Sequence, residues 1–265
     1  WIDCIEANIF DEKKLKDLIS KCEICINLVG ILSEGKKINT FDNIHAKFPF
    51  LISKICKEED IEQFIQLSAL GIEEATDSLY AKSKLNGENE IKKNFPKATI
   101  LRPSVVYSVD DNFTTNFMTL LNLLPFFPIF KNTKFMPIHV SDLTEIIYHV
   151  ISKEVKSMTI ECVGNEVISM KEILKKLLNL MGKKRLLISL PFGVSKIVVK
   201  FFGFLPNPPI TKDQLNLLKK DNVASGKYKT NFDIGVPSVS NFELEVEKYC
   251  EMWRNQGQFS TKKYK

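Results

Sequence analysis

Tyr80 and Lys84 are the two residues whose types and spacing come closest to a catalytic pair. They form a Tyr-x-x-x-Lys pattern, and on a helix this spacing puts both side chains on one face, one turn apart. A tyrosine with an ordinary pKa of about 10 acts as a general acid or base near neutral pH only if a nearby cation favours the phenolate. The pattern is not specific by itself, because six tyrosines in a chain this rich in lysine give about one such pair by chance.

The order of neighbouring elements makes the pair more specific. Ser68 follows an apolar run typical of a strand, Tyr80 and Lys84 lie in the next helical segment, and a further strand leads into Pro103. Lys84 would supply this cation and could also reach a ribose hydroxyl.

The segments around these residues alternate between short apolar runs and amphipathic stretches, as in βαβ units around a parallel sheet. We predict strands over 2–9, 24–29, 64–67 and 99–101, and helices over 11–21, 43–59, 79–94, 170–181 and 211–218. The expected fold class is α/β, a Rossmann-type doubly wound parallel sheet with a smaller C-terminal α+β region. The predicted domains are a dinucleotide-binding, Rossmann-like domain over 1–150 and a smaller helical or mixed region over 151–265.

Composition limits the class of protein. A chain of 265 residues that is 44% hydrophobic and 26% charged can bury a core and is neither disordered nor collagen-like. Its net charge of +5 is small and spread along the chain, whereas readers of nucleic acid carry clustered arginine and strong basic patches. We therefore expect no nucleic-acid partner. Six scattered cysteines favour a reducing compartment over a disulfide framework.

Metal binding is not expected either. Cys22 and Cys25 form one Cys-x-x-Cys, and no second pair completes a zinc site. Because Cys25 falls at the start of a predicted strand, we interpret the pair as buried and inert. His139 and His149 have no carboxylate cluster around them.

The stretch 190–205 is the nearest candidate for a membrane segment. It contains Lys196 and Lys200, and no part of the chain reaches the ~18 uninterrupted apolar residues of a membrane span. Apolar residues spaced three and four apart build one face opposite the lysines: Val194, Ile197, Val198, Phe201, Phe202 and Leu205. Such a helix packs on a core, or it lies on a membrane surface or a partner, and both interpretations remain open.

Taken together, these residues resemble the extended and atypical short-chain dehydrogenase/reductase superfamily over residues 1–150. Ser68, Tyr80 and Lys84 match its catalytic Ser-Tyr-Lys positions. The stretch from Ile26 to Gly30 is similar to its strand and turn beside the nicotinamide ribose. The resemblance implies a nicotinamide dinucleotide, NADP or NAD, held by Asn8, Ile9, Leu28, Val29, Gly30, His45, Tyr80, Lys84, Pro103, Val105 and Val106.

Within this superfamily the chain most resembles the nucleotide-binding accessory subunit family of respiratory complex I (NADH:ubiquinone oxidoreductase) and its bacterial relatives. The similar motifs are Asn-Leu-Val-Gly-Ile-Leu at 27–32, Leu-Ser-Ala-Leu-Gly at 67–71, Asp-Asp-Asn-Phe at 110–113 and the stretch 205–214. The resemblance implies a structural role near the quinone module, without established turnover. The implied partners are complex I subunits or the membrane surface, and the implied location is cytoplasmic or peripheral at the inner, respiratory membrane.

Three features depart from the superfamily pattern. The eleven glycines contain no Gly-x-Gly-x-x-Gly, the fingerprint that puts a pyrophosphate on a helix N-terminus, so we expect that an N-terminal βαβ unit is missing from this chain. Asn8 stands where relatives have an Asp near the adenine. His45 stands where extended enzymes have an active-site Asn, and it could equally be a polar group on a helix face.

Three functions follow, in order of preference. The first is a nucleotide-binding accessory subunit of complex I. The second is an active NAD(P)-dependent oxidoreductase or epimerase that uses Ser68, Tyr80 and Lys84 on a small sugar-like or quinone-linked substrate. The third is a scaffold that has lost its nucleotide.

Overall fold

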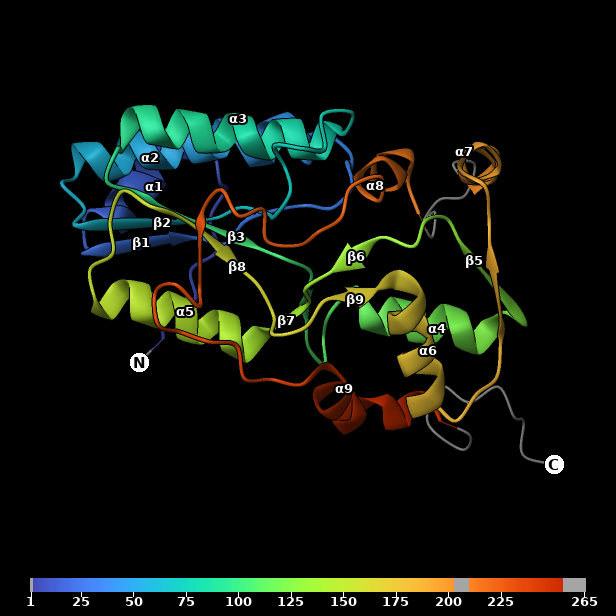
Figure 1. Ribbon diagram of the computed structural model, residues 1–265. Coiled ribbons are helices and arrows are strands. Elements are labelled where there is room, and N and C mark those ends of the chain that lie inside the picture. The colour runs from blue at the N-terminus through green and yellow to red at the C-terminus, as the bar shows by residue number, and fades with distance from the viewer. Residues whose placement is uncertain (1, 203–209, 255–265) are drawn as a thin grey trace. The chain divides into compact units, whose positions relative to one another are not determined.

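The computed structural model describes residues 2–202 and 210–254, which form two compact units (Figure 1). The first unit consists of Trp1–Arg102 with Tyr148–Ile160, and the second of Pro103–Ile147 with Glu161–Lys265. The chain thus leaves the first unit after Arg102 and returns to it at Tyr148, whereas the sequence suggested a single boundary near residue 150. Leu205 of the predicted apolar face, and the first half of the similar stretch 205–214, lie outside the described residues.

Parallel strands form the sheet of the first unit. Strand β1 (Ile24–Asn27) pairs with β2 (Gln63–Leu67), and β2 pairs with β3 (Thr99–Pro103). In this register Asn27 lies opposite Gln66, and Leu67 lies opposite Leu101. The backbone amide of Ile100 donates to the carbonyl oxygen of Met158, just before β8 (Thr159–Cys162).

Helices cover both faces of this sheet. The helices α1 (Glu12–Ile19), α2 (Phe48–Glu58) and α3 (Leu79–Asn94) lie on one face, and the end of α5 (Val140–Ser152), from Tyr148 on, lies on the other (Figure 1). On the first face their apolar side chains form a buried core with β2 and β3, which includes Ile52, Ile55, Phe64, Ile91 and Ile100. On the second face the Gln63 side-chain amide donates to the Val150 carbonyl at 2.9 Å. These layers confirm the predicted doubly wound α/β fold.

Two predicted elements of the first unit differ from the structure. The strand expected over 2–9 is wrong: residues 2–8 form neither strand nor helix, because no described segment pairs with their backbone. The helix expected over 43–59 is present, but it begins as a π-helical turn, Asn43–Lys47, before α2. Pro49 has no N–H to donate to the His45 carbonyl four residues back, and this explains the local widening.

Short strand pairs and helices make up the second unit. The strand β4 (Val106–Tyr107) pairs with β7 (Ile138–His139) and β5 (Phe126–Ile129) with β10 (Leu186–Ser189), both in parallel, and β6 (Lys134–Phe135) pairs antiparallel with β9 (Ile168–Ser169). The remaining elements are α4 (Thr114–Leu123), α6 (Met170–Leu180), α7 (Phe192–Phe202), α8 (Lys212–Leu217), β11 (Lys229–Thr230), α9 (Phe242–Cys250) and a 3-10 turn, Glu251–Trp253. This mixture agrees with the expected α+β region. Within the described residues, no helix combines the length and apolarity needed to cross a bilayer.

Candidate functional site

Two parallel strands of the first unit end side by side, and their last residues shape one edge of the sheet. The Asn27 side-chain amide donates to Gln66 Oε1 at 2.8 Å, and Asn27 Oδ1 accepts from the amide of Val29 at 3.1 Å. These bonds fix the turn that follows β1. Ligands of open α/β sheets bind at the carboxyl ends of the strands, so this edge is the natural place for a site.

Helix α3 brings Tyr80 and Lys84 to this edge. It begins at Ser78, whose side chain accepts from the Ala81 amide, so Tyr80 lies in the first turn and Lys84 one turn later. Lys84 Nζ donates to the Leu67 carbonyl at 3.4 Å. A Cβ placed on Gly30 would lie 3.1 Å from the same Nζ, so the lysine ammonium lies directly against the glycine backbone.

His45 is part of the same cluster, and its hydrogen bonds define its protonation state. Its Nε2 accepts from the backbone amide of Ile31 at 3.0 Å, so the proton of the neutral ring resides on Nδ1. Nδ1 then donates to Ser83 Oγ at 2.9 Å, and Ser83 Oγ donates to the Tyr80 carbonyl at 2.8 Å. Burial, together with the charge of Lys84, lowers the pKa of His45 to about 3. His45 is therefore a neutral, fixed side chain at physiological pH.

Aromatic packing holds the rings of this cluster. The His45 ring stacks on Phe41 with a centroid distance of 5.4 Å, and it meets the Tyr80 ring edge to face at 5.2 Å. Phe41 and Tyr80 also pack edge to face, at 5.8 Å. Only 2% of His45 is exposed, so it is a buried polar group on this helix face.

Gly87 allows α3 to approach the π-helical turn. A Cβ at this position would lie 1.8 Å from the His45 carbonyl oxygen, far inside any contact distance. The sequence analysis missed Gly87, although a glycine inside a helical pattern signals such a close approach. It also missed Phe41, Gln66 and Ser83, whose residue types carry no specific signal.

Burial sets the protonation of the Tyr-Lys pair. It raises the pKa of Tyr80 to about 12, so the phenol is protonated at neutral pH. It lowers the pKa of Lys84 to about 8, against the opposing effect of the Glu88 carboxylate. Lys84 therefore carries its charge at pH 7 and loses it about one pH unit higher.

Ser68 supplies a polar group without a partner. The residue is 5% exposed, and its backbone amide donates to the Leu101 carbonyl at 2.7 Å. Its Oγ is buried and has no hydrogen-bond partner among the described residues. A buried hydroxyl without a partner costs free energy, so this atom fits a ligand that supplies the missing bond.

The other predicted residues are placed as follows. Leu28 and Val29 are exposed by 59% and 39% in the turn after β1. Asn8 Oδ1 accepts from the Phe10 amide in the turn before α1, and Ile9 packs against the core of the first unit. The residues Pro103, Val105 and Val106 belong to the second unit.

The cysteine prediction is only partly right. Cys25 is half-buried and contacts Cys56, which is fully buried, but Cys22 is exposed because it follows the end of α1. Among the described residues, no group of three or more His, Cys, Asp or Glu side chains is arranged to hold a metal ion.

Comparison with known proteins adds sequence and fold relationships. Residues 73–193 match the RmlD substrate binding domain model. The chain is 26% identical to the mitochondrial NADH dehydrogenase [ubiquinone] 1 alpha subcomplex subunit 9 of Arabidopsis thaliana, over 81% of this chain and 57% of that protein. It is 25% identical to the Mus musculus protein of the same name, over 88% of this chain and 62% of that protein. The chain thus spans about three fifths of the length of these relatives.

A solved structure shares the fold. The UDP-glucuronic acid 4-epimerase of Bacillus cereus, in complex with UDP-glucuronic acid and NAD, is 18% identical, with a TM-score of 0.66 over 94% of this chain and 81% of that chain. These matches confirm the resemblance drawn from Ser68, Tyr80 and Lys84 and from the motifs around them. The chain is thus similar in sequence to the alpha subcomplex subunit 9 of mitochondrial NADH dehydrogenase, matches the RmlD substrate binding domain model over part of its length, and shares its fold with the epimerase.

Proposed function

We propose that this protein holds a nicotinamide dinucleotide at the carboxyl edge of the β1–β3 sheet and serves as an accessory subunit of respiratory complex I. In this role the nucleotide stabilises the subunit, and turnover is not required. The protein would lie peripherally at the respiratory membrane. The choice of an accessory subunit is supported by the relatives, which are named as subunits of NADH dehydrogenase and match over 81% and 88% of this chain.

The residues at this edge suit the nicotinamide and its ribose. Lys84 is a charged donor beside a glycine backbone, and Ser68 Oγ is a buried donor or acceptor with no partner among the described residues. The exposed apolar side chains of Leu28 and Val29 provide contact area for a flat ring. When bound, a nicotinamide would supply hydride-transfer chemistry. The sequence has no Gly-x-Gly-x-x-Gly, so these residues account for the nicotinamide half of the ligand only.

The electrostatics of the site favour binding without turnover. A general acid or base works best with a pKa near the operating pH, and a tyrosine with a pKa of about 12 is far from it. Lys84 is still charged at pH 7, because its pKa is about 8, but burial is the cause that sets the raised pKa of Tyr80. Tyr80 would then hold the ligand through its protonated hydroxyl.

The partner proposal draws on the relatives. Two of them are named as alpha subcomplex subunits of the NADH dehydrogenase of mitochondria, and the similarity extends over both units of this chain. The analogous partner of this protein is the complex I of its own respiratory membrane.

Thermal melting with NADH and with NADPH tests the nucleotide proposal. A ligand at about 100 times its Kd adds about 2.7 kcal/mol to the free energy of unfolding, which shifts the melting temperature measurably. We expect a shift with at least one nucleotide, and a much smaller one in Lys84→Met. Lys82→Met changes an exposed lysine of the same helix and should melt like the wild type. Equal shifts in the two variants would refute the assignment of Lys84.

An active oxidoreductase or epimerase is the second candidate, and the intact Ser68, Tyr80 and Lys84 set supports it. Its test is nucleotide oxidation in the presence of membranes and quinones. For an accessory subunit, Tyr80→Phe should leave co-purification with complex I and respiration unchanged. Oxidation that is present in the wild type and lost in Tyr80→Phe would favour the enzyme.

A further inference from the structure

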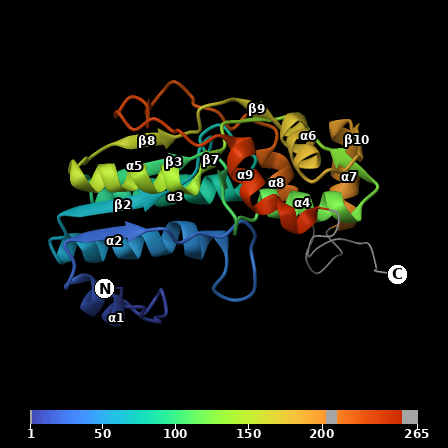
Figure 2. The same ribbon diagram turned by 90° about the horizontal axis from the view of Figure 1, so that it is seen from below.

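We propose that α7 and the adjoining lysine-lined pocket of the second unit form a docking surface for an anionic lipid bilayer. This inference concerns the second unit only and does not depend on the nucleotide site. Helix α7 contacts α8, and Figure 2 shows it next to β10, which pairs with β5.

Helix α7 turns apolar side chains toward solvent. Ser195 and Val199 are buried, with exposed fractions of 0% and 4%, so they mark the face of α7 that packs on the unit. Val194 and Ile197, on another face, are exposed by 43% and 59%. Helix α7 thus packs on the unit through Ser195 and Val199, while Val194 and Ile197 of the predicted apolar face are uncovered.

The neighbouring strand pair extends this apolar surface. Leu186 lies opposite Phe126 in the register of β10 and β5, and the two residues are exposed by 65% and 54%. Ile188, two residues along on the same face, is exposed by 37%. Exposed apolar patches of this kind mark partner or membrane contacts in soluble proteins.

The positive charge around these apolar residues favours binding to an anionic surface. From Gly182 to Thr211 the sequence contains five basic residues and no acidic one: Lys183, Lys184, Arg185, Lys196 and Lys200. The next acidic residue is Asp213, on α8. Lys196 and Lys200 form no ion pair with any described carboxylate. An apolar face flanked by lysines is the pattern of a helix that lies in the interface of an anionic membrane.

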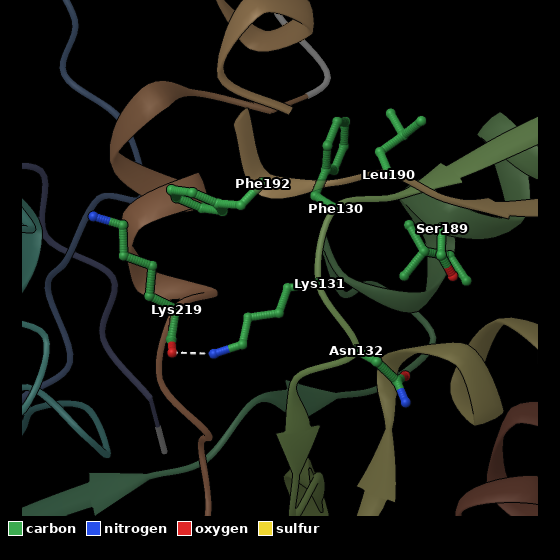
Figure 3. A pocket seen from close by; sticks show the side chains of 8 residues that line it. Phe130, Lys131, Asn132, Ser189, Leu190, Phe192 and Lys219 are labelled. Atoms are coloured by element: carbon green, nitrogen blue, oxygen red, sulfur yellow. Dashed lines mark hydrogen bonds between the residues drawn. The ribbon is translucent and has the colours of Figure 1, made fainter. Parts of the chain in front are cut away.

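The adjoining pocket provides a place for an acidic headgroup. It has a volume of about 460 Å³, and its lining includes Phe130, Leu190 and Phe192 with Lys131 and Lys219 (Figure 3). Lys131 Nζ donates to the Lys219 carbonyl. The ammonium groups of Lys196 and Lys219 lie 5.2 Å and 5.4 Å from the centre of the same Phe192 ring. An anion bound near these two ammonium groups would be attracted by both.

Flotation with lipid vesicles tests the proposal on the full-length protein. One set of vesicles is phosphatidylcholine, and the other is an equimolar mixture of phosphatidylcholine and phosphatidylglycerol. We expect binding to the mixed vesicles only, with an affinity that falls as salt is added. The double variant Lys196→Gln/Lys200→Gln should bind about thirtyfold more weakly, because each lysine near an anionic leaflet contributes a factor of about five.

Matched variants separate this surface from general charge and hydrophobicity. Ile197→Asp should abolish binding, whereas Val239→Asp changes a 78% exposed apolar residue outside α7 and should bind like the wild type. Lys175→Gln removes an exposed lysine of α6 and is the control for charge. Circular dichroism verifies that each variant is folded.

Several outcomes would overturn the proposal. These are absence of binding to the mixed vesicles, equal binding to both vesicle types, and α7 variants that bind as well as their controls. If the wild type does not bind vesicles but sediments as a dimer, and Ile197→Asp sediments as a monomer, this face serves self-association instead. None of these results bears on nucleotide binding, because the melting shift reports on residues of the first unit.

Discussion

Substitution of Gly87 by alanine tests the contact on which the geometry of the candidate site depends. The added methyl would lie 1.8 Å from the His45 carbonyl oxygen, an atom of the backbone that cannot rotate away. Alanine in a helix interior gains about 1 kcal/mol over glycine, but overpacking of a tight contact costs about 1–3 kcal/mol, and a backbone clash lies at the upper end or beyond. The clash therefore prevails, and we expect Gly87→Ala to lower the free energy of unfolding by about 2 kcal/mol.

The assay is urea unfolding followed by far-ultraviolet circular dichroism, with nucleotide affinity as a second measurement. Displacement of the π-helical turn moves His45, so affinity should fall together with stability. Gly193→Ala is the matched control, because a Cβ there meets nothing within 4 Å, and it should leave stability unchanged or raise it. If Gly87→Ala is as stable as Gly193→Ala, α3 does not pack on the His45 carbonyl and this reasoning is refuted.

Two further predictions concern buried charge. His45 has a folded pKa of about 3 against an ordinary 6.5, so the unfolded state binds more protons between these values. The stability that neutral His45 contributes should be fully present above pH 6.5 and should be lost as the pH falls toward 3. The urea midpoint should therefore fall less steeply over this range in His45→Asn than in the wild type. Midpoints that coincide for the two proteins at every pH would contradict this prediction. Arg102 holds the 1% exposed Glu88 carboxylate by bonds of 2.6 and 2.9 Å, so Arg102→Ala should cost about 3–5 kcal/mol. Lys93→Ala, which breaks an exposed pair with Glu90, should cost under about 1 kcal/mol, and equal losses in the two variants would show that the buried pair is not special.

The sequence by itself determined the fold class and most elements of the first unit. Helix α3 begins and ends at the predicted residues, and β1 to β3 lie within two residues of the predicted strands. These features are local: apolar periodicity and capping residues decide them over a few turns of chain. The resemblance was visible for the same reason, because Ser68, Tyr80, Lys84 and the order of the elements around them can be recognised in the sequence.

The tertiary structure alone decided how the site is held. A neutral His45 requires donors and acceptors from Ile31 and Ser83, and Gly87 matters only because a distant carbonyl lies against it. The pKa values of Tyr80 and Lys84 come from desolvation, which depends on every neighbour that excludes water. The strand expected over 2–9 failed for a related reason, because apolar alternation does not supply the partner that a strand needs. Helical periodicity predicts that α7 has an apolar face, but it does not determine which side of the helix the unit buries. Only the structure shows that Val194 and Ile197 are exposed.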